Sequence, residues 1–174
     1  MTAKGHMTLA TTVALISFNT LPYFLLLSFK KLGIIYFSAI IGSIFPDIDE
    51  ENSYIGRRLP LFSIITSSIF KHRTLTHYLI LPLIIAIAGL FTSGLNQLIC
   101  FSFAFGILMH DVGDMLTKGG INGFFFPLFS NAKIALLPRA LRFYTNSIAE
   151  YMIILFLTAI NLFLAYLLIK RILH

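Results

Sequence analysis

The stretch LICFSFAFGILMHDVGDM, residues 98–115, decides how this sequence can fold. It begins as an uncharged, largely apolar run of the kind that crosses a membrane, and it ends with His110, Asp111 and Asp114. Ionisable groups in or beside a membrane segment are costly to bury and by default mark a functional site. The stretch therefore predicts a membrane helix with a polar site at one end.

The composition of the whole chain agrees with a membrane protein. Of its 174 residues, 57% are hydrophobic and 11% are charged, whereas soluble domains have about 25% charged residues. Residues 1–174 are expected to form a single domain. The net charge of +6 lies mostly between apolar segments, which favours the lipid bilayer as the partner and not nucleic acid. The single cysteine, Cys100, indicates neither a disulfide nor a thiolate metal site.

Five apolar segments predict an all-α, polytopic membrane helical bundle with four or five transmembrane or partly re-entrant helices. Pro22 should kink or split the first segment, which is too long for a signal-peptide core and is expected to remain in the protein. The second segment is short for a full span of roughly 20 residues. Residues 61–70 suit a short interfacial helix. The five segments are 7–29, 32–45, about 75–91, about 95–115 and 147–169.

The basic residues orient this arrangement. If all five segments cross, the N-terminus and the loops 46–74 and 116–146 share one side, which carries nine of the 13 Lys and Arg residues. By the positive-inside rule this side faces the cytoplasm. The nine are Lys4, Arg57, Arg58, Lys71, Arg73, Lys118, Lys133, Arg139 and Arg142, against Lys30, Lys31, Lys170 and Arg171 on the other side.

Most histidines and all aspartates fall at segment ends on this predicted cytoplasmic side. They are His6, Asp47, Asp49, His72, His77, His110, Asp111 and Asp114, which leaves out only the terminal His174. Imidazole and carboxylate are ligands of zinc, manganese and iron. We therefore expect a divalent metal site where these segment ends meet.

Helical spacing divides the residues of the opening stretch. His110 and Asp114 are four residues apart, so they share one helix face and can hold one ion. Asp111 lies about 100° from His110 and should cap the helix, orient a ligand or meet solvent. Of Asp47 and Asp49, one can bind the ion and the other can hydrogen-bond a ligand.

Each of these residues also has an ordinary structural interpretation. A histidine at a membrane interface is often only amphipathic, and a carboxylate at a helix end is often a cap or an ion-pair partner of a nearby arginine. Arg57 and Arg58 can be loop charges that neutralise the aspartates. Arg73, within HRTLTH, can equally bind a phosphate oxygen. It is the gathering of four polar patches on one side that favours a metal site.

Four motifs together resemble the YdjM-like family of bacterial inner-membrane metal-dependent hydrolases. They are MTAKGH (1–6), PDIDEENSYIGRRL (46–59), HRTLTH (72–77) and GILMHDVGDMLTKGGINGFFFP (106–127). The resemblance covers roughly residues 1–130 and departs from the family pattern at Thr74, Tyr78 and Lys118. It implies kinship with the α-helical zinc-dependent phospholipase C and P1 nuclease group. It also implies metal-ligand roles for His6, Asp47, His77, His110 and Asp114, with His72 as a further ligand.

The hypothesis that follows is a hydrolase in the bacterial inner membrane, with its metal site facing the cytoplasm. The metal, expected to be zinc, would activate water against a phosphoester, which can be a lipid. Asp49 or Asp111 would act as the general base, and Arg73 would bind the phosphate. Two alternatives stay open: a non-catalytic metal-binding protein, structural or part of a metal-handling assembly, and a membrane scaffold whose His and Asp residues form salt bridges.

Overall fold

A computed structural model describes residues 1–69, 75–129 and 132–173, and it is mostly helical. A two-stranded antiparallel sheet, β1 (Ile121–Asn122) with β2 (Lys133–Ile134), is the small exception to the expected all-α fold. The helices are α1 (Ala3–Thr20), α2 (Pro22–Leu25), α3 (Phe29–Gly42), the 3₁₀ helix η1 (Phe45–Asp49), α4 (Pro60–Ile69), the 3₁₀ helix η2 (Leu75–His77), α5 (Ile80–Leu90), α6 (Gly94–Met115) and α7 (Ile148–Leu173).

Local sequence sets the helix boundaries near the N-terminus. The Thr2 side chain accepts a hydrogen bond from the Gly5 amide and caps the start of α1. Leu21, which precedes Pro22, has extended backbone with ψ of 124°, as the ring of a following proline requires. The expected split of the first apolar segment at Pro22 is confirmed.

Three stretches of the described residues are long and apolar enough to cross a membrane. They are Phe29–Asp49, Gly94–Met115 and Ile148–Leu173. The second predicted segment, 32–45, is thus part of a 21-residue stretch, because α3 begins at Phe29 and η1 follows it to Asp49. The third segment forms the shorter apolar helix α5. The helix expected over residues 61–70 is present as α4, and its place at the membrane interface stays a prediction. Only 6% of the α7 window is buried, so this helix presents apolar side chains outward, as lipid contact requires.

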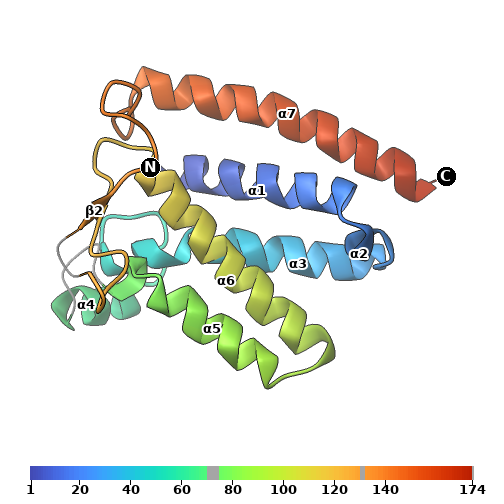
Figure 1. Ribbon diagram of the computed structural model, residues 1–174, viewed down its shortest axis with the longest axis horizontal. Coiled ribbons are helices and arrows are strands. Elements are labelled where there is room, and N and C mark those ends of the chain that lie inside the picture. The colour runs from blue at the N-terminus through green and yellow to red at the C-terminus, as the bar shows by residue number, and fades with distance from the viewer. Residues whose placement is uncertain (70–74, 130–131, 174) are drawn as a thin grey trace.

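Helix α6 lies at the centre of the packing. It contacts α3, α5 and α1, and α7 lies along α1 (Figure 1). The α3–α6 contact brings backbone against backbone: a Cβ atom on Gly106 would lie 2.1 Å from the Ala39 carbonyl oxygen, and one on Gly42 would lie 2.3 Å from the Phe103 carbonyl oxygen. Small residues allow this close approach between helices in membranes.

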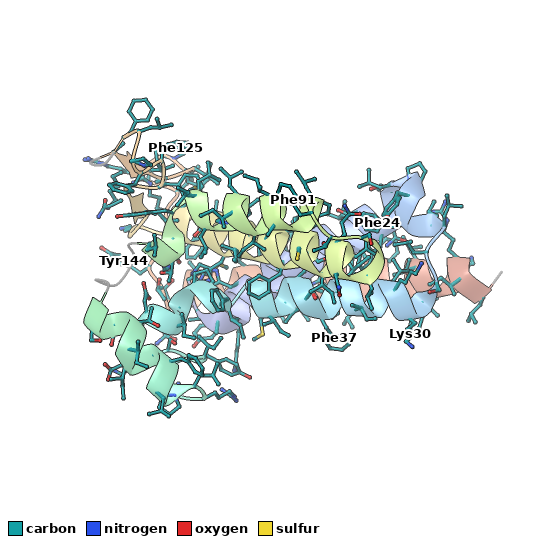
Figure 2. All side chains as sticks on the ribbon, turned by 90° about the horizontal axis from the view of Figure 1, so that it is seen from below. Phe24, Lys30, Phe37, Phe91, Phe125 and Tyr144 are labelled. Carbon is teal, nitrogen blue, oxygen red and sulfur yellow. The ribbon has the colours of Figure 1, made fainter. Side chains whose placement is uncertain are left out.

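The directions in which the helices run bring the polar segment ends together. The start of α1, the end of α6, the start of α7 and the short helix α4 lie at one end of the bundle (Figure 1). The opposite end carries α2 and the start of α3, where Phe24 and Lys30 lie (Figure 2). This is the convergence that the sequence predicts, although which end faces the cytoplasm stays a prediction.

The close α3–α6 approach gives a direct test of the packing. Gly106→Ala should destabilise the protein by about 1–3 kcal/mol, because the added methyl group forces the two helices apart. The control Gly33→Ala lies in α3, where no atom comes within 4 Å of the added Cβ, and it should not lower the midpoint of thermal unfolding in detergent. Equal midpoints for the two variants would contradict the packing described here.

Candidate metal centre

Five of the six predicted metal ligands come together at the polar end of the bundle. Ligand atoms of His6, Asp47 and His110 lie within 4.8 Å of one another, and so do those of His77, His110 and Asp114. His110 belongs to both groups. The sixth predicted ligand, His72, and the predicted phosphate-binding Arg73 lie outside the described residues.

Helix α6 supplies the central pair. His110 and Asp114 are both buried on one face of α6, as the four-residue spacing predicts. The ring of His6 stacks on the ring of His110, with centroids 3.7 Å apart and an angle of 11° between the planes. Gly113 makes room for it, because a Cβ atom there would lie 2.7 Å from His6 Nδ1.

Hydrogen bonds fix the tautomer of His110. Its Nδ1 atom lies 2.8 Å from the carbonyl oxygen of Ser43. A carbonyl can only accept a hydrogen bond, so Nδ1–H of His110 is the donor. In the neutral ring Nε2 then carries the lone pair.

His77 is held in the same way by a short chain of groups. The Thr76 hydroxyl donates to Asp49 Oδ2 at 2.7 Å, so its oxygen accepts from Nδ1–H of His77 at 3.0 Å. Asp49 Oδ2 is itself 3.7 Å from His77 Nδ1. A carboxylate behind a histidine is the usual way in which a metal-binding imidazole is oriented. In the neutral ring of His77, the Nε2 atom therefore also carries a lone pair.

The two lone pairs face each other. Nε2 of His77 and Nε2 of His110 are 3.2 Å apart, and both side chains are fully buried. Carboxylate oxygens surround them, with Asp47 Oδ1 3.6 Å from Nε2 of His110 and Asp114 Oδ2 3.8 Å from Nε2 of His77. Nitrogen and oxygen lone pairs that converge in a buried site suit a divalent cation such as zinc.

His6 is in the protonation state that binds metal. Burial, together with the neighbouring His110, lowers the pKa of His6 from 6.5 to about 3, although Asp114 acts in the opposite direction. The ring is therefore neutral at pH 7. Neither of its nitrogens has a hydrogen-bond partner among the described residues, although Nε2 lies 3.4 Å from Asp114 Oδ1. A buried nitrogen of this kind normally has a partner, and a metal ion would provide one.

Among the five described ligands, only Asp47 is more than marginally exposed. The side chains of His6, His77, His110 and Asp114 are at most 1% exposed, whereas that of Asp47 is 20% exposed. Solvent therefore reaches the cluster beside Asp47.

The two aspartates proposed as general bases lie in different surroundings. Asp49 supports His77 and is 2% exposed. Asp111 is fully buried, and neither of its oxygens has a hydrogen-bond partner among the described residues. It belongs to neither ligand group, as its helical position predicts. Of the three options from sequence, contact with solvent is wrong, because the helix packing covers Asp111 completely.

Sequence reasoning missed how the N-terminus is held. The α-amino group of Met1 forms a buried ion pair with Asp114. Glu150, a residue without a role in the sequence analysis, is fully buried and accepts hydrogen bonds from the Thr2 amide at 2.6 Å, the Thr2 hydroxyl at 2.9 Å and the Asn146 amide at 2.6 Å. An acidic residue in the first turn of an otherwise apolar helix was the available signal. Glu150 thereby ties α7 to the start of α1, four residues before His6.

Metal analysis tests the centre. The protein purified in detergent should contain stoichiometric metal, and His110→Ala and Asp114→Ala should each reduce its metal affinity by more than about tenfold, since even residues that only orient ligands contribute 10- to 100-fold. Ser102→Ala changes another buried polar residue of α6 and should retain the metal. Metal-free wild-type protein with the same fold would show that a shared proton, not a cation, separates the two histidines.

Comparisons with known proteins assign the chain to a family. The family described as YdjM inner membrane protein matches residues 1–172. The uncharacterized protein YvsG of Bacillus subtilis (strain 168) is 31% identical over 132 residues, which cover 75% of this chain and 78% of that protein. No solved structure matches. The match over nearly the whole chain, with membrane-spanning helices and the His/Asp centre at their ends, shows that this protein belongs to the YdjM inner membrane protein family.

Proposed function

We propose that the protein is a membrane-embedded, metal-dependent hydrolase that acts on a phosphoester. The observation that carries this proposal is a cleft of 440 Å³ that opens beside the ligand Asp47 and is lined by Lys4 and Arg57. Its volume is within the range of small-molecule sites. A polar cleft that joins solvent to a ligand cluster is what a catalytic centre needs and a purely structural site does not.

The ligand cluster would hold the metal through His6, Asp47, His77, His110 and Asp114. When bound there, a divalent cation supplies Lewis-acid stabilisation of charge on a phosphoryl oxygen and makes water more acidic. Zinc binds well to histidine nitrogen and carboxylate oxygen, and manganese and iron also bind these ligands. Asp49 positions His77 through Thr76.

The cleft residues suit an anionic substrate. The side chains of Lys4 and Arg57 provide donors for phosphate oxygens, and within the described part of the chain Arg57 forms no ion pair. Glu50 also lines the cleft. Because Asp49 and Asp111 are buried and do not line the cleft, Glu50 is better placed than either to accept a proton from water. A lipid phosphoester fits the location at the ends of three membrane-spanning stretches.

A non-catalytic metal site is the second candidate, and one observation favours it. Four of the five ligands are at most 1% exposed, and a structural metal is enclosed by protein ligands. A non-catalytic site would bind the metal as tightly as a catalytic one. The protein would then hydrolyse no phosphoester, even with the metal bound.

Kinetics separate the two candidates. With a soluble phosphodiester such as bis(p-nitrophenyl) phosphate, and with phospholipid in mixed micelles, hydrolysis should require metal and be lost in His110→Ala. Arg57→Gln should raise KM by about tenfold, corresponding to about 1.4 kcal/mol, because a phosphate contact is lost. Arg58→Gln is the matched control, since Arg58 instead lies over the Tyr54 ring at 3.7 Å. Hydrolysis that survives both chelation and His110→Ala would overturn the proposal.

A further inference from the structure

A second polar hollow lies apart from the metal centre, in the segment that joins α6 to α7. It has a volume of 340 Å³, and four basic residues, Lys118, Lys133, Arg139 and Arg142, line it without an acidic one. None of the four belongs to the His/Asp ligand groups. They come from the residues after α6, from β2 and from the turn around residues 138–142.

Backbone contacts hold this segment in place. The Lys118 amide donates to the Phe143 carbonyl at 2.9 Å, and the Leu136 amide donates to the Met115 carbonyl at 3.0 Å. The connection is therefore fastened to the end of α6 at two points. Backbone hydrogen bonds therefore hold the loop that carries the basic side chains.

The basic side chains are held by neutral groups. Arg142 Nε donates to the Leu137 carbonyl at 2.7 Å, Lys133 Nζ donates to the Lys118 carbonyl at 3.3 Å, and Lys118 Nζ lies 4.1 Å from the centre of the Tyr144 ring. Within the described ranges none of the four forms an ion pair. Four like charges around one hollow repel one another, and a bound anion would relieve that repulsion.

The surroundings of the hollow indicate where the anion comes from. It lies between the end of α6 and the start of α7, two helices long enough to cross a membrane. Leu136, Leu141 and Tyr144 are 55%, 66% and 65% exposed, and Tyr144 lies at the end of the bundle opposite Lys30 (Figure 2). Exposed apolar and aromatic side chains beside clustered basic ones at the end of a span are typical of contact with lipid head groups.

We propose that the hollow formed by Lys118, Lys133, Arg139 and Arg142 binds a phosphate group, and that the exposed apolar residues of the same segment favour the head group of an anionic phospholipid as its source. The four cations supply charge-assisted hydrogen bonds to phosphate oxygens, and the exposed Leu136, Leu141 and Tyr144 of the same segment contact the acyl chains. This site does not depend on the metal centre or on its proposed chemistry.

The test measures ligand-induced stabilisation of the full chain in detergent. The probes are dioctanoyl phosphatidylglycerol, dioctanoyl phosphatidylcholine, and inorganic phosphate against chloride at matched ionic strength. Phosphatidylglycerol should raise the midpoint of thermal unfolding saturably, and phosphatidylcholine should not. Lys133→Gln with Arg139→Gln should weaken the apparent affinity by about thirtyfold. Lys30→Gln with Lys31→Gln removes the same charge at the opposite end and should leave the affinity unchanged.

A charge-conserving pair, Lys133→Arg with Arg139→Lys, should keep the response and shows that the loss is not a folding defect. Saturable stabilisation by inorganic phosphate that requires the same residues would support the phosphate site and identify free phosphate as its source. Equal responses to the two lipids, equal losses in the two glutamine pairs, or no stabilisation by any probe would overturn the proposal.

Discussion

The structure depends on two imidazole nitrogens that face each other inside the protein. Nε2 of His77 and Nε2 of His110 are 3.2 Å apart. In the neutral form of each ring Nε2 carries the lone pair, because the ring donates through Nδ1 to Thr76 or to Ser43. Two buried acceptors at this distance repel each other and have lost their water. The arrangement becomes favourable when a cation lies between them, and the surrounding carboxylates fit the same requirement.

The packing of the helices positions the two histidines. The Ser43 carbonyl that orients His110 lies just past α3, and the contact of α3 with Gly106 of α6 fixes how closely the two helices approach. On the other side, Glu150 fastens the start of α1 to α7, which places His6 against His110. The hydrogen bonds of Ser43, Thr76 and Glu150 thus hold a polar centre at the end of an apolar bundle, and dispersion between small residues brings the helices together.

Much of this could be predicted from the sequence. Hydrophobic length predicted the helices, Pro22 predicted the break after α1, and the four-residue spacing of His110 and Asp114 predicted their shared face. The convergence of His6, Asp47 and His77 was predicted because each lies at a segment end on the same predicted side of the membrane. Other features depend on contacts between segments distant in sequence and leave no periodic signal. They include the role of Asp49 behind His77, the burial of Asp111 and the Glu150 contacts with Thr2.

The family assignment fixes the setting, an inner membrane protein, while the chemistry rests on the arrangement of side chains. The most direct test of the central claim is anomalous diffraction from crystals of the protein, recorded on both sides of the absorption edge of the metal it contains. We expect an anomalous peak within bonding distance of Nε2 of both His77 and His110, beside the carboxylates of Asp47 and Asp114. No peak there, with the two nitrogens still in hydrogen-bond contact, would contradict it.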